Sequence, residues 1–362
     1  MNSSIAALRL RNQGLVKQQD RRQPAAVVAG LGAVQAQEFP FAKWALALRM
    51  PEGTTDAQVQ RAFDRGQILR THVMRPTWHF VAPADIRWML ELTAPHVHRV
   101  MAPYNRRLGL DAELLGRATK IFERILRDSQ FQTRSELGAR LAEAGIEAKG
   151  VRLAHIAMHA ELECVICSGP RRGKEFTYAL VGERAPRAQR LPRDEALARL
   201  ALRYFKSHGP ATVRDFVWWS GLRTADAKRG LEINEARDQL IDGRTYWTIG
   251  SASGRTAQRR AVHLLPVYDE YVVAYRDREA VPHGPSTLDA GSRGSVTFLH
   301  ALVIDGQIAG TWRTARRDTR CAIDVIPTRR LTEQERRAIA VAAARYERFL
   351  GAPVTTRIAA PG

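Results

Sequence analysis

Two glutamines, Gln35 and Gln37, stand two residues apart after an apolar, helix-like run, with Pro40 close behind them. On a helix, residues i and i+2 point about 200° apart, so the pair could not share a helix face. In an extended or loop backbone both side chains point the same way, and Ala36 turns inward. Two carboxamides on one side of a loop would form a small polar site. The alternative is a pair of solvated glutamines at a helix C-terminus.

The net charge of the chain is strongly positive. Its 362 residues include 56 Lys plus Arg against 37 Asp plus Glu, which leaves a formal charge of +19. Arginine is suited to bidentate phosphate contact. We therefore predict a polyanionic partner, with double-stranded DNA as the leading candidate. The alternative is a GC-rich genome, whose Arg codons would raise the charge without any function.

Composition also limits the class of protein. The hydrophobic content of 45% suits a large buried core, and the length suits two to four domains. No apolar run approaches the ~18 residues that span a bilayer. The first residues do not resemble a secretory signal, and three cysteines indicate a reducing compartment. We expect a cytoplasmic, nucleoid-associated monomer that does not contact a membrane.

The glutamine pair falls inside a predicted pattern of helices followed by a hairpin. Pro40 pushes the residue before it out of the helical region, so the chain must turn near the glutamines. Helices followed by a hairpin are typical of a winged helix-turn-helix module. Helices are expected at 4–18, 24–34 and 41–50, and strands at Ile68–Met74 and Thr77–Val81 around the turn Arg75-Pro76.

The same order recurs twice. Thr133 and Glu136 form a capping box that opens a helix. Strands at Cys164–Ser168 and Lys174–Val181 then flank the turn Gly169–Gly173. A third copy is predicted over 194–250, with a helix that Thr212 caps.

From about residue 261 the pattern changes to strands. Leu264–Tyr275 alternates and is rich in Val and Tyr, and Asp305-Gly306 is a two-residue hairpin signal. Thr332 and Glu335 cap a final helix that ends at Gly351. The predicted fold class is α+β: tandem winged helix-turn-helix domains, then a small antiparallel β domain with a C-terminal helix. The expected domains are 1–108, which holds the glutamine motif, 109–185, 186–260 and 261–362.

Basic residues occupy the tips of the first two predicted hairpins. We expect these tips to contact phosphates or the minor groove, with a solvated turn as the alternative. His79, Asp269, Glu270 and Asp277 could each serve as an acid, a base or a DNA contact, but for each one taken individually a structural hydrogen bond or ion pair is preferred. The predicted DNA contacts are Arg75, His79, Arg171, Arg172 and Lys174.

A zinc site is considered at His155, His159, Cys164 and Cys167 and is disfavoured. The helix that would carry the two histidines has core-type apolar neighbours, and in a strand the two cysteines would face opposite sides. The metalloprotease motif lacks its glutamate. We predict no metal and no cofactor.

Several segments taken together resemble one family, the AlkZ-like and YcaQ-like winged-helix DNA glycosylases of bacteria. The segments follow the family's order over almost the whole chain, which is more specific than any one of them. They are Arg11–Leu15, Val34–Gln37, Met74–His79, His159–Leu162, Ser168–Gly173, Gly209–Phe216, Trp218–Leu222, Leu265–Tyr271, Tyr275–Arg278 and Gly310–Trp312. Cys164 does not match a family position.

The resemblance implies excision of bulky N7-alkylated purines, including crosslinked guanines, and it makes Gln35-Ala36-Gln37 the catalytic motif. N7 alkylation puts a positive charge on the base, so the base leaves neutral without a protonated acid. Carboxamide oxygens can stabilise the sugar cation and place a water. No lysine nucleophile is implied, so a monofunctional enzyme is expected. The alternative is a non-enzymatic winged-helix DNA-binding protein, such as a transcriptional regulator.

Overall fold

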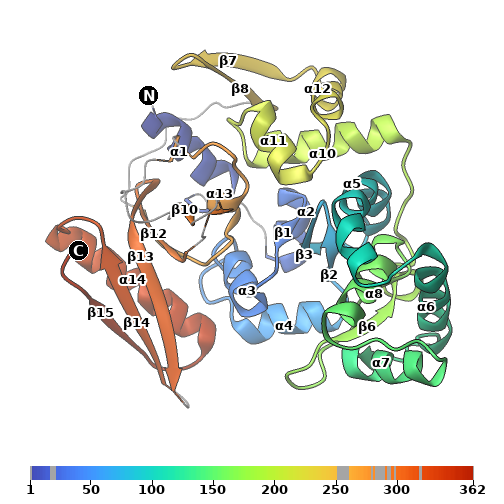
Figure 1. Ribbon diagram of the computed structural model, residues 1–362. Coiled ribbons are helices and arrows are strands. Elements are labelled where there is room, and N and C mark those ends of the chain that lie inside the picture. The colour runs from blue at the N-terminus through green and yellow to red at the C-terminus, as the bar shows by residue number, and fades with distance from the viewer. Residues whose placement is uncertain are drawn as a thin grey trace.

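The computed structural model contains both helices and several small sheets along the chain, so the protein has a mixed helix-and-sheet fold (Figure 1). The structure describes residues 2–16, 22–250, 261–278, 280–281, 290–291, 295–296, 299–317 and 320–361. No helix in these ranges is long and apolar enough to span a bilayer.

The glutamine motif lies in the first sheet, whose strands have the order β1-β3-β2. Helix α2 starts at Pro24, which suits a first helical position, and gives way at Gly32, which has a φ of 90°. The hairpin turn lies at Met74, with a φ of 64°, one residue before the predicted turn. The elements are α1 Asn2–Asn12, α2 Pro24–Leu31, β1 Val34–Gln35, α3 Phe39–Ala47, α4 Asp56–Asp64, β2 Leu69–Val73 and β3 Arg75–Val81.

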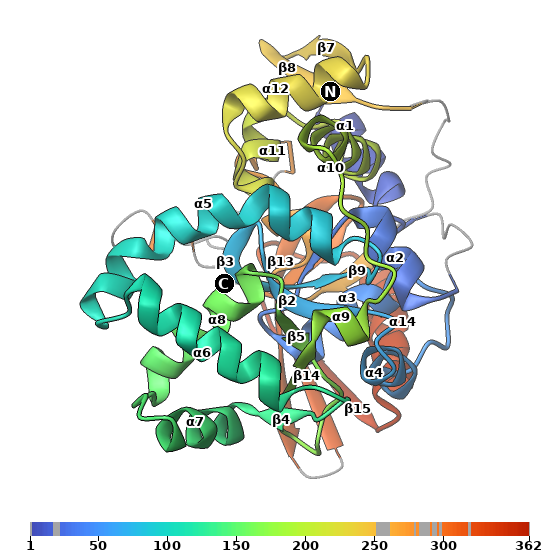
Figure 2. The same cartoon turned by 90° about the vertical axis from the view of Figure 1, so that its right-hand side faces the viewer.

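The second group of elements also runs from helices to a hairpin. The predicted capping box of Thr133 and Glu136 is confirmed at the start of α7. The predicted hairpin is confirmed too, with strand order β4-β6-β5. Figure 2 shows α5 running between α6 and α8 on one side and the helices of residues 193–233 on the other. The bounds are α5 Ile86–Arg107, α6 Ala112–Ile125, β4 Gln132–Thr133, α7 Arg134–Glu143, α8 Gly150–Leu162, β5 Ile166–Ser168, β6 Thr177–Leu180 and α9 Val181–Arg184.

The third group consists of three helices and a two-stranded hairpin. Thr212 caps α11 through a capping box with Asp215, and Gly221 ends this helix with a φ of 70°. The elements are α10 Arg193–Ser207, α11 Val213–Ser220, α12 Thr224–Ile233, β7 Arg237–Ile241 and β8 Arg244–Thr248.

The C-terminal region contains a five-stranded sheet of order β15-β14-β13-β12-β9. The Asp305-Gly306 hairpin and the capping box of Thr332 and Glu335 are confirmed. The sheet is antiparallel except for β14 and β15, which run parallel because α14 crosses between them. The elements are β9 Val262–Leu265, α13 Glu270–Val273, β10 Ala290–Gly291, β11 Ser295–Val296, β12 Ala301–Ile304, β13 Gln307–Arg317, β14 Arg320–Pro327, α14 Glu333–Leu350 and β15 Val354–Ile358.

The predicted strand over Leu264–Tyr275 is wrong beyond Leu265. Pro266 cannot continue a sheet ladder, and Tyr268 takes a φ of 63°. The Asp269 carboxylate then accepts a hydrogen bond from the Tyr271 N–H and so caps the short helix α13. The alternating apolar residues of this segment are therefore core residues of a helix.

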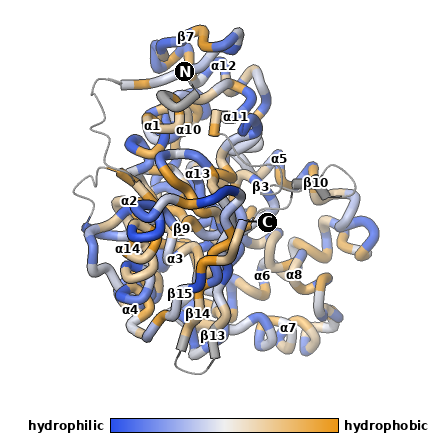
Figure 3. The backbone as a smooth tube through the Cα atoms, turned by 90° about the vertical axis from the view of Figure 1, so that its left-hand side faces the viewer, coloured by the Kyte–Doolittle hydropathy of each residue, from blue (hydrophilic) through white to orange (hydrophobic). Residues whose placement is uncertain are grey.

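Two hydrophobic cores cross the expected domain boundaries. One joins α2, α3 and α4 to the C-terminal sheet and α14, and in it the Trp44 indole N–H donates to the Leu264 carbonyl at 2.8 Å. Another joins β2, β3 and α5 to α10, α11 and α12. Figure 3 shows hydrophilic and hydrophobic segments along α6, α7 and α8, which enclose a smaller core. The first sheet therefore sits at the centre of the molecule.

Candidate active site

The backbone around the glutamine pair is extended, as the spacing predicts. Strand β1 pairs with β3, so that Gln35 lies opposite His79, and the Ala36 N–H donates to the Trp78 carbonyl at 2.7 Å. Ala36 is fully buried, Gln35 is 7% exposed and Gln37 is half-buried. The two carboxamides therefore flank an inward-facing alanine at the edge of the central sheet, just before α3.

Gln35 is held at both ends. Its backbone N–H donates to Glu270 Oε1 at 2.9 Å, and its side-chain Oε1 accepts from Arg75 Nη2 at 2.9 Å. Burial lowers the pKa of Arg75, and the nearby Glu270 carboxylate opposes this shift. Because both polar ends of Gln35 have charged partners, its carboxamide has one preferred orientation.

Glu270 is a fully buried carboxylate behind the motif. It also accepts from the Trp219 indole N–H at 2.9 Å, and His208 Nε2 lies 3.4 Å away. Burial alone would raise the pKa of Glu270, but the contacts with His208 and the Gln35 N–H outweigh it and lower that pKa. Glu270 is therefore ionised at neutral pH and supplies a fixed negative charge beside the motif.

The position of Glu270 depends on its neighbour Asp269. Arg49 donates to both carboxylate oxygens of Asp269 at 2.8 Å and to the Gln13 side chain at 2.9 Å. Burial opposes the charge on Arg49, but Asp269 raises the pKa of this guanidinium above its usual value. This bidentate pair fixes the start of α13, so that Glu270 faces Gln35.

His79 is buried beside Arg75. Burial, and then the Arg75 charge, lower the pKa of His79 to about 3, so its ring is neutral at pH 7. The ring Nδ1 lies 2.9 Å from the Thr77 carbonyl, which can only accept, so Nδ1 carries the proton. Nε2 can then accept from Arg75 Nη2 at 3.4 Å. The neutral histidine thus helps to orient Arg75 toward Gln35.

Gln37 is held much more loosely than Gln35. Its Oε1 accepts from the Trp78 N–H at 3.4 Å, which is long for a hydrogen bond. Its side-chain NH₂ group makes no hydrogen bond to any residue that the structure describes. Gln37 is also the more exposed of the two. Its side chain is therefore less constrained than that of Gln35.

The predicted DNA contacts on the second hairpin have different surroundings. The Arg171 guanidinium lies 4.6 Å from the Phe176 ring, and its backbone N–H donates to Asp64. Arg172 pairs with Glu136 at 2.6 Å, and both side chains are largely exposed. Lys174 is exposed, and its ammonium group has no partner within the described ranges. DNA contact by these residues, and by Arg75 and His79, stays a prediction.

The residues considered for zinc do not converge on one point. His155 Nδ1 lies 2.8 Å from Asn105 Oδ1, and Cys167 is buried, which raises the pKa of its thiol. Among the described residues, the group whose ligand atoms come within 4.8 Å of one another is His98, His159 and Glu163.

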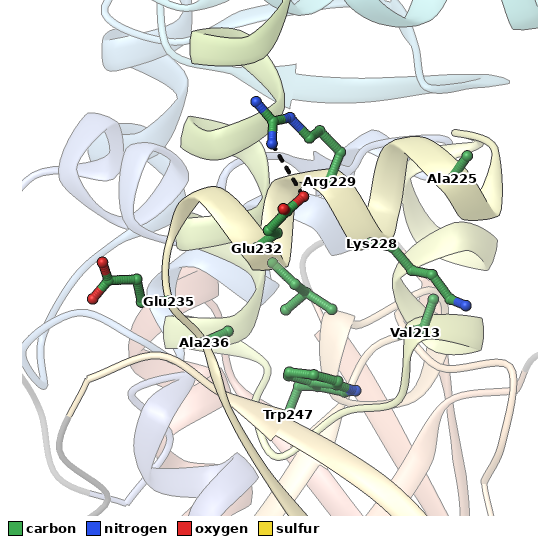
Figure 4. Close-up of a pocket in the computed structure, with 9 residues that line it drawn as sticks. Val213, Ala225, Lys228, Arg229, Glu232, Glu235, Ala236 and Trp247 are labelled. Carbon is green, nitrogen blue, oxygen red and sulfur yellow. Dashed lines mark hydrogen bonds and ion pairs between the residues drawn. The ribbon is translucent and has the colours of Figure 1, made fainter.

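A groove of about 670 Å³ lies away from the motif, between α11, α12 and β8 (Figure 4). Trp247, Leu231 and Val213 line it, and an exposed ion pair joins Arg229 to Glu232 at 3.1 Å. These elements lie at the top of Figure 1, whereas β1 lies near its centre.

Sequence reasoning missed the part that Glu270 plays at the site, although a structural role was preferred for it. The available signal was a pair of carboxylates between Tyr268 and Tyr271, in a segment otherwise rich in apolar residues. Asp277 forms an ion pair with Arg244. Arg70, whose Nε donates to the Ala36 carbonyl at 3.0 Å, carried no signal of its own.

Comparisons with known proteins identify the family of this chain. The curated interstrand DNA cross-link repair glycosylase of Streptomyces sahachiroi is 27% identical over 325 residues, which cover 85% of this chain and 86% of that protein. The solved structure of Streptomyces sahachiroi DNA glycosylase AlkZ has the same fold, with a TM-score of 0.79 and 22% identity over 99% of both chains. The family model described as DNA glycosylase AlkZ-like matches residues 28–349. The chain therefore belongs to the AlkZ-like family of DNA glycosylases.

Proposed function

We propose that this DNA glycosylase hydrolyses the N-glycosidic bond of N7-alkylated or crosslinked purines in double-stranded DNA. The observation that carries the proposal is the unequal pair of carboxamides, with Gln35 fixed by Glu270 and Arg75 and Gln37 open. The related Streptomyces protein is named for interstrand cross-link repair, which supports a bulky lesion.

In the proposed mechanism, Gln37 places the attacking water and Gln35 stabilises the sugar cation. A carboxamide cannot remove a proton from water at neutral pH, so the driving force must come from a leaving base that already carries a positive charge. The fixed Glu270 carboxylate and the oriented amide dipoles then favour the oxocarbenium-like transition state. This chemistry needs water only, so neither a metal nor a cofactor is required.

No covalent enzyme–DNA intermediate forms in this mechanism. Hydrolysis transfers a hydroxyl group from water to the sugar carbon, the lesion base departs neutral with the bonding electron pair, and the remaining proton of the water passes to solvent. The product is an abasic site in an intact strand, which makes the enzyme monofunctional. Borohydride reduction during turnover should therefore trap no protein–DNA adduct.

The order of elements supports a winged-helix scaffold for DNA binding. Each of the first three groups consists of helices followed by a hairpin, and we infer that these are the winged helix-turn-helix units. The net charge of +19 supports double-stranded DNA as partner. We propose that the protein acts as a monomer at the nucleoid in the cytoplasm. A non-enzymatic regulator is disfavoured because the chain belongs to a glycosylase family.

Base release from N7-methylguanine duplex and from a crosslinked duplex, measured side by side, tests the proposal. Gln37→Ala should lower the single-turnover rate by about 100-fold, in the range seen when one preorganised polar group is removed. The exposed Gln239 on β7 offers a matched control, and Gln239→Ala should keep the wild-type rate. Equal base release by wild type and Gln37→Ala would refute the assigned roles.

A further inference from the structure

A polar cavity, separate from the groove of Figure 4, adjoins the glutamine motif. It has a volume of about 290 Å³ and lies between the first and second hairpins. The Trp78 backbone N–H donates to Gln37 Oε1, and the Arg70 Nε donates to the Ala36 carbonyl, so two residues of the cavity wall contact the motif. The residues that line it include Arg70, Trp78, Arg134, Glu161, Lys174 and Phe176.

Arg70 is the central group of this cavity and is 7% exposed. Its guanidinium lies between two aromatic rings, 4.2 Å from the centre of Trp78 and 4.5 Å from that of Phe176. The Nε atom donates a hydrogen bond to the Ala36 carbonyl at 3.0 Å. The two terminal nitrogens make no hydrogen bond or ion pair with the residues that the structure describes.

Two carboxylates line the cavity, but neither forms an ion pair with Arg70. Glu161 is buried and contacts His72, and Glu175 lies exposed on the rim. Burial lowers the pKa of Arg70 to about 10, the charges of Arg134 and Arg171 act in the same direction, and Glu161 opposes them. Arg70 is therefore still charged at pH 7. The two terminal nitrogens of Arg70 are not among the fully buried polar atoms, so they open onto the cavity, where an anion can pair with them.

The planar guanidinium with two free nitrogens matches the geometry of a phosphate group. We propose that Arg70 clamps a phosphodiester of the lesion-bearing strand and so fixes the lesion nucleotide relative to Gln37. This inference rests on the proposed excision of a DNA lesion at the motif. Arg70 connects the phosphate to the motif directly, because its Nε donates a hydrogen bond to the carbonyl of Ala36, between the two glutamines.

A guanine edge is the competing ligand for an arginine of this kind, through its O6 and N7 atoms. The lesion itself cannot serve as that ligand, because alkylation occupies its N7. An intact guanine nearby could, and the test must separate it from phosphate. Phosphate contact is indifferent to base identity, whereas a base contact is not.

The test measures binding to a duplex with one N7-methylguanine whose sugar carries a 2′-fluorine, which blocks hydrolysis, so the lesion sets the register and the test does not depend on catalysis. Neutral methylphosphonates are placed one at a time along the strand, and affinity for wild-type protein is measured by fluorescence anisotropy. One position should weaken binding by about 10-fold in wild type and have no further effect in Arg70→Gln. Arg70→Gln should also reduce the slope of log K against log salt by about 0.9.

Arg345 provides a matched control, since it is a largely buried arginine whose Nη2 donates to the carbonyls of Ala47, Leu48 and Met50. Arg345→Lys should keep both the salt slope and the sensitive methylphosphonate position. Replacing guanines by 7-deazaguanine should leave wild-type affinity unchanged.

Three results would overturn the proposal: no single sensitive phosphate, a sensitive phosphate that persists in Arg70→Gln, or a loss of affinity with 7-deazaguanine. If Arg70→Gln does not fold, the wild-type scan decides alone, because it requires no variant. Binding that behaves as expected without any base release would refute the proposed glycosylase substrate and leave the phosphate site intact.

Discussion

The first and second hairpins have basic tips in the sequence, yet the structure gives these tips different surroundings. Arg75, at the first tip, lies inside the molecule, where it donates to Gln35 and faces the ring of His79. At the second tip, Arg172 is paired on the surface and Lys174 is exposed. A basic residue in a hairpin turn can therefore serve the active site or the DNA backbone, depending on what packs over the turn.

The packing that separates the two hairpins comes from distant parts of the chain. Trp218 on α11 has its ring centre 6.0 Å from the Arg75 guanidinium, and Glu270 on α13 contacts Gln35 from the other side. For the second hairpin the tip residues Gly173 and Lys174 are exposed. We therefore propose different roles for the two hairpins: the first orients Gln35, and the second contacts DNA.

The largest effect should come from Arg75. Arg75→Ala removes the donor that orients Gln35, so the single-turnover rate on N7-methylguanine duplex should fall by about 100-fold. Anisotropy should show affinity for undamaged duplex within about 2-fold of wild type, because Gln35 and His79 engage the Arg75 guanidinium, whereas a larger loss would support the phosphate contact predicted for Arg75 from the sequence. Weakened binding with an unchanged rate at saturating enzyme would show that Arg75 contacts the DNA backbone, and the two hairpins would then not differ in function.

A smaller effect should appear in the pH dependence of stability. The pKa of His79 is about 3 in the fold, below the ordinary value of about 6.5, so the unfolded chain binds the proton first as pH falls. The free energy of unfolding is therefore unaffected by His79 above about pH 6.5, and it decreases as the pH falls from there toward 3. By pH 5 the loss is about 2 kcal/mol.

Urea unfolding at pH 7 and pH 5 measures this loss, and His79→Gln should show a smaller drop than wild type. His155 is a suitable control, because it is only partly buried and its Nδ1 contacts Asn105. His155→Gln should keep most of the wild-type drop. If His79→Gln and wild type lose equal stability, His79 is not buried in its neutral form.

The smallest effect should come from Lys174. Lys174→Ala removes one exposed cation, so affinity for duplex should fall about 3-fold and the salt slope by about 0.9. The excision rate at saturating enzyme should not change, because Lys174 contacts neither glutamine. Arg172→Ala should weaken binding less, since Arg172 is already paired with Glu136. A rate defect in Lys174→Ala would extend the active site to the second hairpin.

Local signals in the sequence predicted much of the fold. The capping boxes at Thr133 and Thr332 and the hairpin at Asp305-Gly306 involve residues within a few positions of one another, and all three formed. The segment after Leu265 was misread because apolar alternation looks alike in a strand and in a buried short helix. There, Pro266 and the Asp269 cap decided the outcome.

The site was predictable only in part. The glutamine motif itself was found, but the partner that fixes Gln35 lies 235 residues away in the chain. No periodicity links Glu270 to Gln35, since a contact of that length depends on how α13 packs against the first sheet. Arg70 was missed for the same reason: its function follows from the rings of Trp78 and Phe176, which come from two different hairpins.

The anchoring of Gln35 by Glu270 has a consequence for synthesis of the protein. A ribosome completes both glutamines early, yet the carboxylate that holds the first of them is added only after residue 269. A nascent or truncated chain that stops short of this point has the whole motif and most of the positive charge, but no acceptor for the Gln35 N–H. Under the proposed mechanism, base excision therefore requires a chain that extends beyond residue 269, although the motif itself lies near the start of the chain.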